Sequence, residues 1–242
     1  MKTKGWIMNC LMIAAILLAG VETLFAADAV LGVTGNSAYV WRGITFNDGG
    51  VLQPSLDVRK GGFGMNVWGN MDLEDDYNEA LDSGQFSEID LTLSYGFAIQ
   101  SVSISFGYIE YLFPNADTPA GREIFTTAAI EPLKGLSLGI ALYYEIDEVE
   151  DYYANLNMSY AYSFTESLSC KIGAAVGYIG EDYSVGGESG MNDLLASLSV
   201  TYAFSPALSV TAGYYYVDSL DEDVLPDQDV SSFGGIGASY LF

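Results

Sequence analysis

Apolar and polar residues alternate along most of the chain with the period of two that is typical of β-strands. From Gly32 onward the alternation predicts twelve segments, each long enough for the roughly 9–11 residues of a tilted transmembrane strand. The predicted strands are 32–46, 51–60, 62–73, 86–97, 101–113, 123–132, 136–146, 151–164, 168–179, 192–204, 208–217 and 231–242.

The connections between these segments alternate in length. Short turns lie at 61, 98–100, 133–135, 165–167 and 205–207. The other set is longer and more polar, with 47–50 and 147–150 as its short members, and otherwise occupies 74–85, 114–122, 180–191 and 218–230. This pattern predicts an all-β fold, a transmembrane antiparallel β-barrel of about 12 strands with both termini in the periplasm. Ten or fourteen strands remain open if segments merge or split.

The two faces of the predicted strands differ in chemistry. One face is apolar and uncharged, as in Leu91, Leu93 and Tyr95, which suits contact with lipid. The opposite face is small and polar, as in Ser103 and Ser105. A soluble sandwich or lipocalin-like barrel would turn the apolar face inward and carry charged residues outside, but Lys is almost absent from these strands. The membrane barrel is therefore favoured.

Aromatic residues recur where strands end. The chain closes on Tyr240 and Phe242, and the same spacing occurs internally at 95–97, 162–164 and 202–204. Aromatic residues at strand ends form the interfacial girdles of membrane barrels. A terminal Phe with an aromatic residue two positions earlier is typical of the last strand of outer-membrane barrels. We interpret Tyr240 and Phe242 as the assembly signal for the barrel-assembly machinery.

The N-terminus has the pattern of a secretory signal peptide. Lys2 and Lys4 precede a twelve-residue apolar stretch, 7–18, which is too short to span a membrane as a helix. We expect residues 1–27 to be a signal peptide, cut after Ala26 or Ala27 with Ala29 as the alternative, and 28–242 to be the barrel. The remaining chain would hold one cysteine, Cys170, and no internal disulfide.

The net charge is −24. The predicted leader carries Lys2, Lys4 and Glu22, so its removal leaves −25. Such a field repels nucleic acid, which disfavours DNA or RNA as a partner. The partners expected instead are outer-membrane lipid, lipopolysaccharide and small solutes or ions.

The chain has no histidine, the usual general base of outer-membrane hydrolases. It also shows no Gly-x-Ser-x-Gly elbow, no Cys/His zinc spacing and no phosphate-binding glycine loop. We therefore predict that the protein is not an enzyme and has no cofactor, no dedicated metal site and no catalytic residues.

Acidic residues cluster in the longer connections. The candidate acidic mouth consists of Glu74, Asp75, Asp76, Asp147, Glu148, Glu150, Asp221, Glu222 and Asp223. Three interpretations stay open: solvated loops, an electronegative pore mouth that concentrates cations, and loose Ca²⁺ or Mg²⁺ binding that bridges to lipopolysaccharide.

Small inward residues cannot fill a twelve-stranded barrel, because eight strands are already just filled by side chains. The strand alternation assigns a candidate pore lining of Asn66, Trp68, Asp72, Glu88, Asp90, Tyr153, Asn155, Asn157 and Tyr215. Arg42, near the outer end of the first predicted strand, is either paired with an acidic group across the lumen or a rim charge.

Three short segments between Ser37 and Asp72 resemble the TorF-type family of outer-membrane porins. They are Ser37-Ala38-Tyr39-Val40-Trp41-Arg42-Gly43-Ile44-Thr45, Gln53-Pro54-Ser55-Leu56-Asp57 and Gly62-Phe63-Gly64-Met65-Asn66-Val67-Trp68-Gly69. The resemblance implies a channel without naming its solute.

These observations together predict a porin-like channel in the outer membrane of a Gram-negative bacterium. It would let small solutes diffuse passively, with a preference for cations because the loops are acidic and Lys and Arg are scarce in the lumen. The alternative is a non-conducting structural or adhesive barrel whose acidic loops bind divalent cations or a partner.

Overall fold

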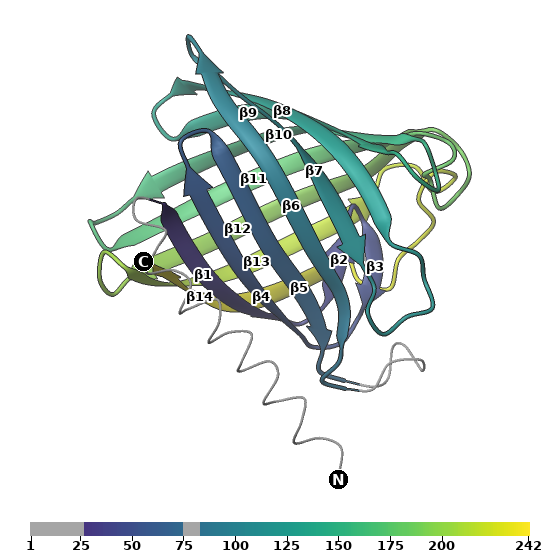
Figure 1. Cartoon of the computed structure of the whole chain (residues 1–242), viewed down its shortest axis with the longest axis horizontal. Coiled ribbons are helices and arrows are strands. Elements are labelled where there is room, and N and C mark those ends of the chain that lie inside the picture. Colours follow the sequence, from purple (N-terminus) through teal and green to yellow (C-terminus); the bar gives the residue numbers. More distant parts are fainter. Residues whose placement is uncertain (1–26, 75–82) are drawn as a thin grey trace.

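The strand alternation produces a closed antiparallel barrel of twelve strands in the described part of the chain (Figure 1). The structure is a computed structural model that describes residues 27–74 and 83–242. Its strands are β1 (Asp28–Asn36), β2 (Tyr39–Trp41), β3 (Ile44–Asn47), β4 (Val51–Lys60), β5 (Phe63–Asp72), β6 (Phe86–Ile99), β7 (Val102–Leu112), β8 (Gly121–Leu133), β9 (Leu136–Glu145), β10 (Tyr152–Ser163), β11 (Leu168–Ile179), β12 (Gly190–Ala203), β13 (Leu208–Ser219) and β14 (Ser232–Leu241).

The barrel closes where β1 pairs with both β14 and β4. Val30 faces Leu241 on one side and Asp57 on the other. Each remaining wall strand pairs with its neighbours in sequence, so the only separate sheet in the described residues is the β2–β3 hairpin. Closure leaves no free sheet edge, which a structure surrounded by lipid requires.

The predicted barrel and its strand number are confirmed, but the first predicted strand, 32–46, is wrong. The wall strand β1 ends at Asn36, and 39–47 forms the β2–β3 hairpin. Trp41 faces Ile44 across a two-residue turn, Arg42-Gly43. Both turn residues have positive φ, 50° and 84°, as a type I′ hairpin turn requires, so the chain reverses where the alternation suggested continuity.

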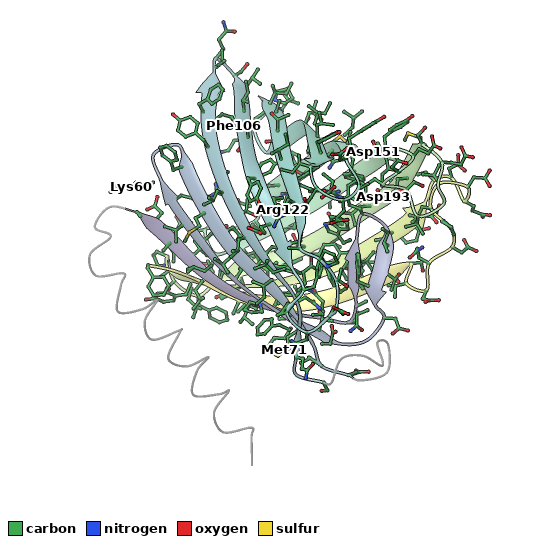
Figure 2. The ribbon with its side chains drawn as sticks, turned by 45° about the vertical axis from the view of Figure 1, so that its right-hand side comes forward. Lys60, Met71, Phe106, Arg122, Asp151 and Asp193 are labelled. Atoms are coloured by element: carbon green, nitrogen blue, oxygen red, sulfur yellow. The ribbon has the colours of Figure 1, made fainter. Side chains whose placement is uncertain are left out.

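The two ends of the barrel differ in their connections. At one end the turns are tight, and Gly61 and Gly135 adopt positive φ of 59° and 84° there. Lys60 and Phe106, labelled in Figure 2, lie toward this end. The longer loops gather at the other end. Outer-membrane barrels place their short turns in the periplasm and their longer loops outside the cell, which gives the barrel its orientation.

The outer surface of the wall is apolar. Leu93 and Ile140 are 58% and 50% exposed, although water-exposed leucine and isoleucine of this size are costly in a soluble protein. Aromatic pairs at strand ends lie in edge contact at the turn end of the barrel, including Tyr202–Phe204 and Tyr240–Phe242. The exposed apolar wall and its aromatic border match the lipid-facing band of an outer-membrane barrel.

No helix among the described residues is long and apolar enough to cross a membrane.

The buried core lies inside the barrel, at the loop end. Tyr153, Ile179 and Val224 pack together there, with Tyr143 and Tyr183 against them. Val224 and Leu225 belong to the last loop and are each about 1% exposed, so this loop turns into the lumen. Loops therefore occupy part of the outer half of the barrel.

Candidate functional site

Segment 37–50, which contains the β2–β3 hairpin, folds into the lumen instead of projecting from it. Figure 1 shows β2 and β3 between the near wall of β5 to β7 and the far wall of β11 to β13. At the base of the hairpin, the Ser37 N–H donates to the Gly234 carbonyl at 2.9 Å. Asn47 accepts the Gly49 N–H through its side chain at 2.7 Å, which turns the chain back toward β4. The hairpin is thus fixed at both of its ends.

The hairpin tip carries Arg42 across the lumen to Glu123 of β8. Nη1 and Nη2 of Arg42 donate to Oε1 and Oε2 of Glu123 at 2.7 and 2.8 Å, a two-pronged ion pair. The two side chains are 7% and 0% exposed. Of the two alternatives left open for Arg42, the cross-lumen pair is therefore the one present. Removing one member of such a buried pair typically costs about 3–5 kcal/mol.

Aromatic rings surround the Arg42 guanidinium. Its central carbon lies 4.1 Å from the ring centre of Trp41, 4.4 Å from Tyr153, 4.7 Å from Tyr143 and 5.4 Å from Tyr183. Glu123 also accepts hydrogen bonds from the hydroxyls of Tyr111 at 2.7 Å and Tyr183 at 2.6 Å. We call Tyr111, Glu123, Tyr143, Tyr153 and Tyr183 the guanidinium cage.

Burial alone would lower the pKa of Arg42, since it penalises the charged form. Attraction and hydrogen bonding to Glu123 outweigh that penalty and raise the pKa above its usual value. The pKa of Tyr183, in the loop beside it, is raised mainly by burial, while Arg42 opposes the rise. Arg42 therefore stays a cation and Tyr183 a hydrogen-bond donor at any physiological pH.

Further hydrogen bonds hold the hairpin against the wall and the last loop. The Tyr39 hydroxyl donates to Glu88 of β6 at 2.7 Å, and Asn192 of β12 donates to the Arg42 carbonyl at 2.8 Å. Gly43 has no room for a side chain, because a Cβ there would lie 2.5 Å from Leu225 and 2.8 Å from Asp193. Asp193 is labelled at the loop end in Figure 2. The tip is therefore locked between β12 and the inward-turned last loop.

Carboxyl groups outnumber cations around the hairpin. Glu88 accepts from Tyr39, and Asp193 accepts from the Tyr153 hydroxyl and the Asn192 amide, both at 3.0 Å. Asp90, next to Glu88 on the inner face of β6, has one buried carboxylate oxygen without a hydrogen-bond partner in the described residues. The narrow part of the lumen thus holds Glu88, Asp90 and Asp193 beyond the Arg42–Glu123 pair.

On the turn side of the hairpin the lumen is hollow. A cavity of about 410 Å³ lies against Tyr39, Trp68 and Tyr215. A second cavity of about 300 Å³ continues toward the turn end, where Gly32, Thr211 and Ser239 line it. Both cavities are bounded by Thr34, Asn36, Ser55 and Tyr215, so they adjoin.

A ladder of polar side chains runs along the wall beside the first cavity. Asn36 donates to Gln53 at 2.8 Å, Gln53 donates to Asn70 at 2.9 Å, and Asn70 donates to Asp72 at 2.9 Å. The ladder crosses β1, β4 and β5 in order. Because these amides satisfy one another, the wall of this chamber is polar and fixed in shape.

The predicted pore-lining residues divide into three groups. Trp68 and Glu88 contact Tyr39 of the hairpin, Asp90 follows Glu88 by two residues on the same face of β6, and Asp72 ends the amide ladder. Tyr153 belongs to the guanidinium cage, and Tyr215 stacks on Phe233 at 4.8 Å. The remaining ones lie on the inner face away from the hairpin: Asn66 opposite Asp57, and Asn155 and Asn157 hydrogen-bonded to each other at 2.9 Å.

The predicted acidic mouth is not one cluster. Asp75 and Asp76 lie outside the described residues, and Glu74 borders Gly49 and Gly50 of the hairpin. Asp147 forms an ion pair with Arg122, while the backbone N–H groups of Glu148 and Glu150 donate to Glu145 at 3.0 and 3.1 Å. Asp221 accepts from the Asp223 N–H at 3.1 Å, and Glu222 is exposed beside it. Asp221 thus shapes its own loop, whereas the loop at 147–150 is shaped by Glu145, which is not one of the predicted mouth residues.

In the described residues no group of three or more His, Cys, Asp or Glu side chains is arranged to hold a metal ion.

Sequence reasoning missed most of the cage, namely Tyr111, Glu123, Tyr143 and Tyr183, and also missed Asp193 and Gly43. Four of these lie at strand ends, where inward and outward positions cannot be separated without the register. One signal was available: Gly43 after Arg42 is a turn-forming position inside an apolar stretch. A second was the apolar pair Val224-Leu225 in an otherwise acidic loop.

No protein-family model matches the chain, and no curated protein matches it. Several solved structures share its fold. The KdgM porin is 12% identical with a TM-score of 0.58, over 88% of this chain and 99% of that one, and a second KdgM structure is a complex with disordered oligogalacturonate. The NanC porin is 12% identical with a TM-score of 0.58, over 87% of this chain and 98% of that one.

An outer-membrane channel from Pseudomonas putida F1 is 9% identical with a TM-score of 0.55, over 90% of this chain and 96% of that one. At these identities the likeness establishes the fold. The closed twelve-stranded barrel and its apolar wall are those of an outer-membrane protein of a Gram-negative bacterium.

Proposed function

We propose that the protein is a porin-like channel through which small solutes diffuse passively across the outer membrane. The observation that carries the proposal is the hollow part of the lumen, a cavity of about 410 Å³ beside the hairpin that adjoins a second one of about 300 Å³ nearer the periplasmic turns. A barrel with a purely structural role has no need of a polar chamber of this size. The mechanism is diffusion through a hydrated lumen, with the hairpin setting the width.

We further propose that the channel prefers cations. Among the described residues, the hairpin region holds Glu88, Asp90 and Asp193, and its cation Arg42 is already paired with Glu123. A narrow passage lined by carboxyl groups and walled by low-dielectric protein attracts cations and repels anions. The exposed acids of the loops add to the same field. Oligogalacturonate is a polyanion, so we do not expect this lumen to favour the kind of molecule found with the KdgM porin.

The resemblance of residues 37–72 to TorF-type porins supports the channel proposal, since that family consists of porins. The candidate lining residues nearest the hairpin, Glu88 and Asp90, would then act on passing ions. Asn66, Asn155 and Asn157 would contact solute farther along the path.

The C-terminal strand is proposed to carry the assembly signal. Tyr240 and Phe242 lie in edge contact at 5.0 Å, and the Phe242 N–H donates to the Ala29 carbonyl at 2.9 Å, which joins the last residue to β1. An exposed aromatic pair on a strand that completes the barrel is a suitable feature for the barrel-assembly machinery to bind. Lipid and lipopolysaccharide would surround the finished wall.

The proposal is tested by reconstituting the refolded mature protein into planar bilayers and recording single-channel current in symmetric KCl. We expect discrete current steps in symmetric KCl. Under a KCl gradient we expect the reversal potential to shift toward the equilibrium potential of potassium. Folding is checked separately by the mobility shift on heating that folded outer-membrane barrels show on gels.

A folded protein without current steps would contradict the channel. That result would favour the non-conducting structural or adhesive barrel whose acidic loops bind divalent cations or a partner. Steps with equal potassium and chloride permeability would keep the channel and overturn only its cation preference.

A further inference from the structure

We propose that the guanidinium cage is a binding site for solutes that carry a guanidinium group, and that Arg42 occupies it until such a solute displaces the hairpin tip. The inference rests on the proposed channel function, because it names the class of solute that the narrow part of the lumen recognises.

The cage does not belong to the hairpin that fills it. Tyr111, Glu123, Tyr143 and Tyr153 come from β7, β8, β9 and β10, four consecutive strands of the wall, and Tyr183 comes from the loop after β11. Strand pairing fixes the four wall positions relative to one another, with Tyr143 facing Tyr153 and Phe125 across its two neighbouring strands. The site therefore persists when Arg42 leaves.

The chemistry of the cage selects a planar cation with several donors. Glu123 accepts two parallel N–H bonds at 2.7 and 2.8 Å, a geometry that a guanidinium offers and a spherical alkali ion does not. Three tyrosine rings of the cage lie within 4.4 to 5.4 Å of the cation centre. Ring faces and a bidentate carboxylate together describe an organic-cation site.

An empty cage would keep its shape and the position of its carboxyl group. The hydroxyls of Tyr111 and Tyr183 donate to Glu123, and Tyr183 also accepts from Arg42 at 3.0 Å, so two hydrogen bonds still orient the carboxyl group when Arg42 leaves. Glu123 is fully buried, and a buried carboxylate without a counter-ion is strongly unfavourable. Loss of Arg42 therefore creates a preorganised site that favours any cation able to fit it.

Arg42, which fills the cage, has a strained backbone conformation. Arg42 has a positive φ of 50°, which is unfavourable for a residue with a side chain. Its tether gives it an effective concentration in the millimolar range or higher, which a free solute must exceed. Displacement would free the tip from Glu123 while Tyr39 keeps its bond to Glu88, so the hairpin would loosen only at its tip and the solute would take the place of Arg42 in the lumen.

The test compares the wild type with Arg42→Ala and with the double variant Arg42→Ala/Glu123→Gln in planar bilayers. The probe is N-methylguanidinium chloride, which replaces KCl at constant ionic strength. Methylammonium chloride is the control, because its cation lacks the planar group with two parallel N–H donors. For Arg42→Ala we expect saturable block of the current by methylguanidinium at millimolar concentrations. The concentration that gives half-block should be at least about tenfold lower for methylguanidinium than for methylammonium.

In the wild type the block should need a much higher probe concentration, because Arg42 competes. In the double variant it should disappear. Equal block of the single and double variants, or equal block by both probes, would overturn the proposal. Should Glu123→Gln fail to fold, Arg42→Ala/Tyr183→Leu replaces it, since Tyr183 lies in a loop; we expect the blocking concentration to rise about threefold to tenfold.

A binding measurement separates this site from the channel proposal. Methylguanidinium should raise the melting temperature of detergent-solubilised Arg42→Ala, and leave that of the double variant unchanged. A raised melting temperature in a protein that passes no current would support the guanidinium site and contradict the channel function. Current steps without block by methylguanidinium and without a change in melting temperature would support the channel function and contradict the guanidinium site.

Discussion

The outer and inner halves of the lumen are built from different kinds of residue. The outer half is packed by the β2–β3 hairpin and the last loop, with buried aromatic rings and the Arg42–Glu123 pair. The inner half is bounded by Gly32, Thr34, Ser55 and similar small residues, and it stays open. Both halves lie on the same twelve strands, so the difference comes from what the loops place inside the wall.

This contrast separates two roles. The packed half holds the charges and the narrowest contacts, so it is expected to decide which solutes pass. The open half offers space and polar groups without tight contact, so it is expected to conduct what the first half admits. A channel organised in this way changes its selectivity through one loop while the barrel stays constant.

The largest effect is expected from removing the hairpin. Replacing residues 38–48 with a short Gly-Ser linker takes Arg42 and the rings of Tyr39 and Trp41 out of the lumen. We expect the single-channel conductance to rise at least about threefold, because the outer half then resembles the inner half. Unchanged conductance in a folded variant would show that the hairpin does not limit the flow.

A smaller effect is expected when only the tip is released. Arg42→Ala leaves Glu123 without its counter-ion, so the free energy of unfolding should fall by about 3 kcal/mol, measured by thermal unfolding in detergent. Conductance should rise by less than after hairpin removal, since Tyr39 still holds the hairpin to Glu88. Arg42→Lys is the matched control, because it keeps the charge and loses only the two-pronged geometry. A loss of stability as large in Arg42→Lys would contradict this reading.

Ionic strength distinguishes buried from exposed carboxyl groups. Raising KCl from about 0.1 M to about 1 M shortens the screening length from about 10 Å to about 3 Å. We expect the cation preference to fall yet stay measurable, because Glu88 and Asp90 lie inside the wall, where screening is weaker. Complete loss of the preference at high salt would assign it to the exposed loops.

The smallest effect is expected in the inner half. Tyr215→Ala removes a ring that borders both cavities, where the passage is already open. We expect conductance to change by less than roughly a fifth, since flow through two sections in series is limited by the narrower one. A large rise in conductance would move the narrow section from the hairpin to the neighbourhood of Tyr215.

Much of the barrel follows from alternation. The sequence predicted eleven of the twelve wall strands closely, because their lipid-facing positions are apolar and each turn interrupts the period. The failure at 32–46 has a physical cause. A hairpin folded against an aromatic core alternates as a wall strand does, so Tyr39, Trp41 and Ile44 gave no sign of leaving the wall. Only Gly43 marked the reversal.

The site was less accessible from the sequence, because it depends on contacts between distant segments. Arg42 was expected to have one of two roles, and its partner Glu123 lies 81 residues away among many other acids. Choosing Glu123 needs the barrel register and the depth of the hairpin, which local patterns do not encode. None of the three interpretations of the acidic clusters predicts that Val224 and Leu225 are buried and draw the last loop inward.

The most direct test of the account compares where the charge selectivity lies. Reversal potentials under a KCl gradient are measured for the wild type, for Glu88→Gln/Asp90→Asn near the hairpin, and for Glu148→Gln/Glu222→Gln in the loops. The account predicts a potassium-selective wild type, a shift toward zero in the hairpin-region variant, and little change in the loop variant. A shift confined to the loop variant would contradict the claim that the packed outer half of the lumen selects the solute.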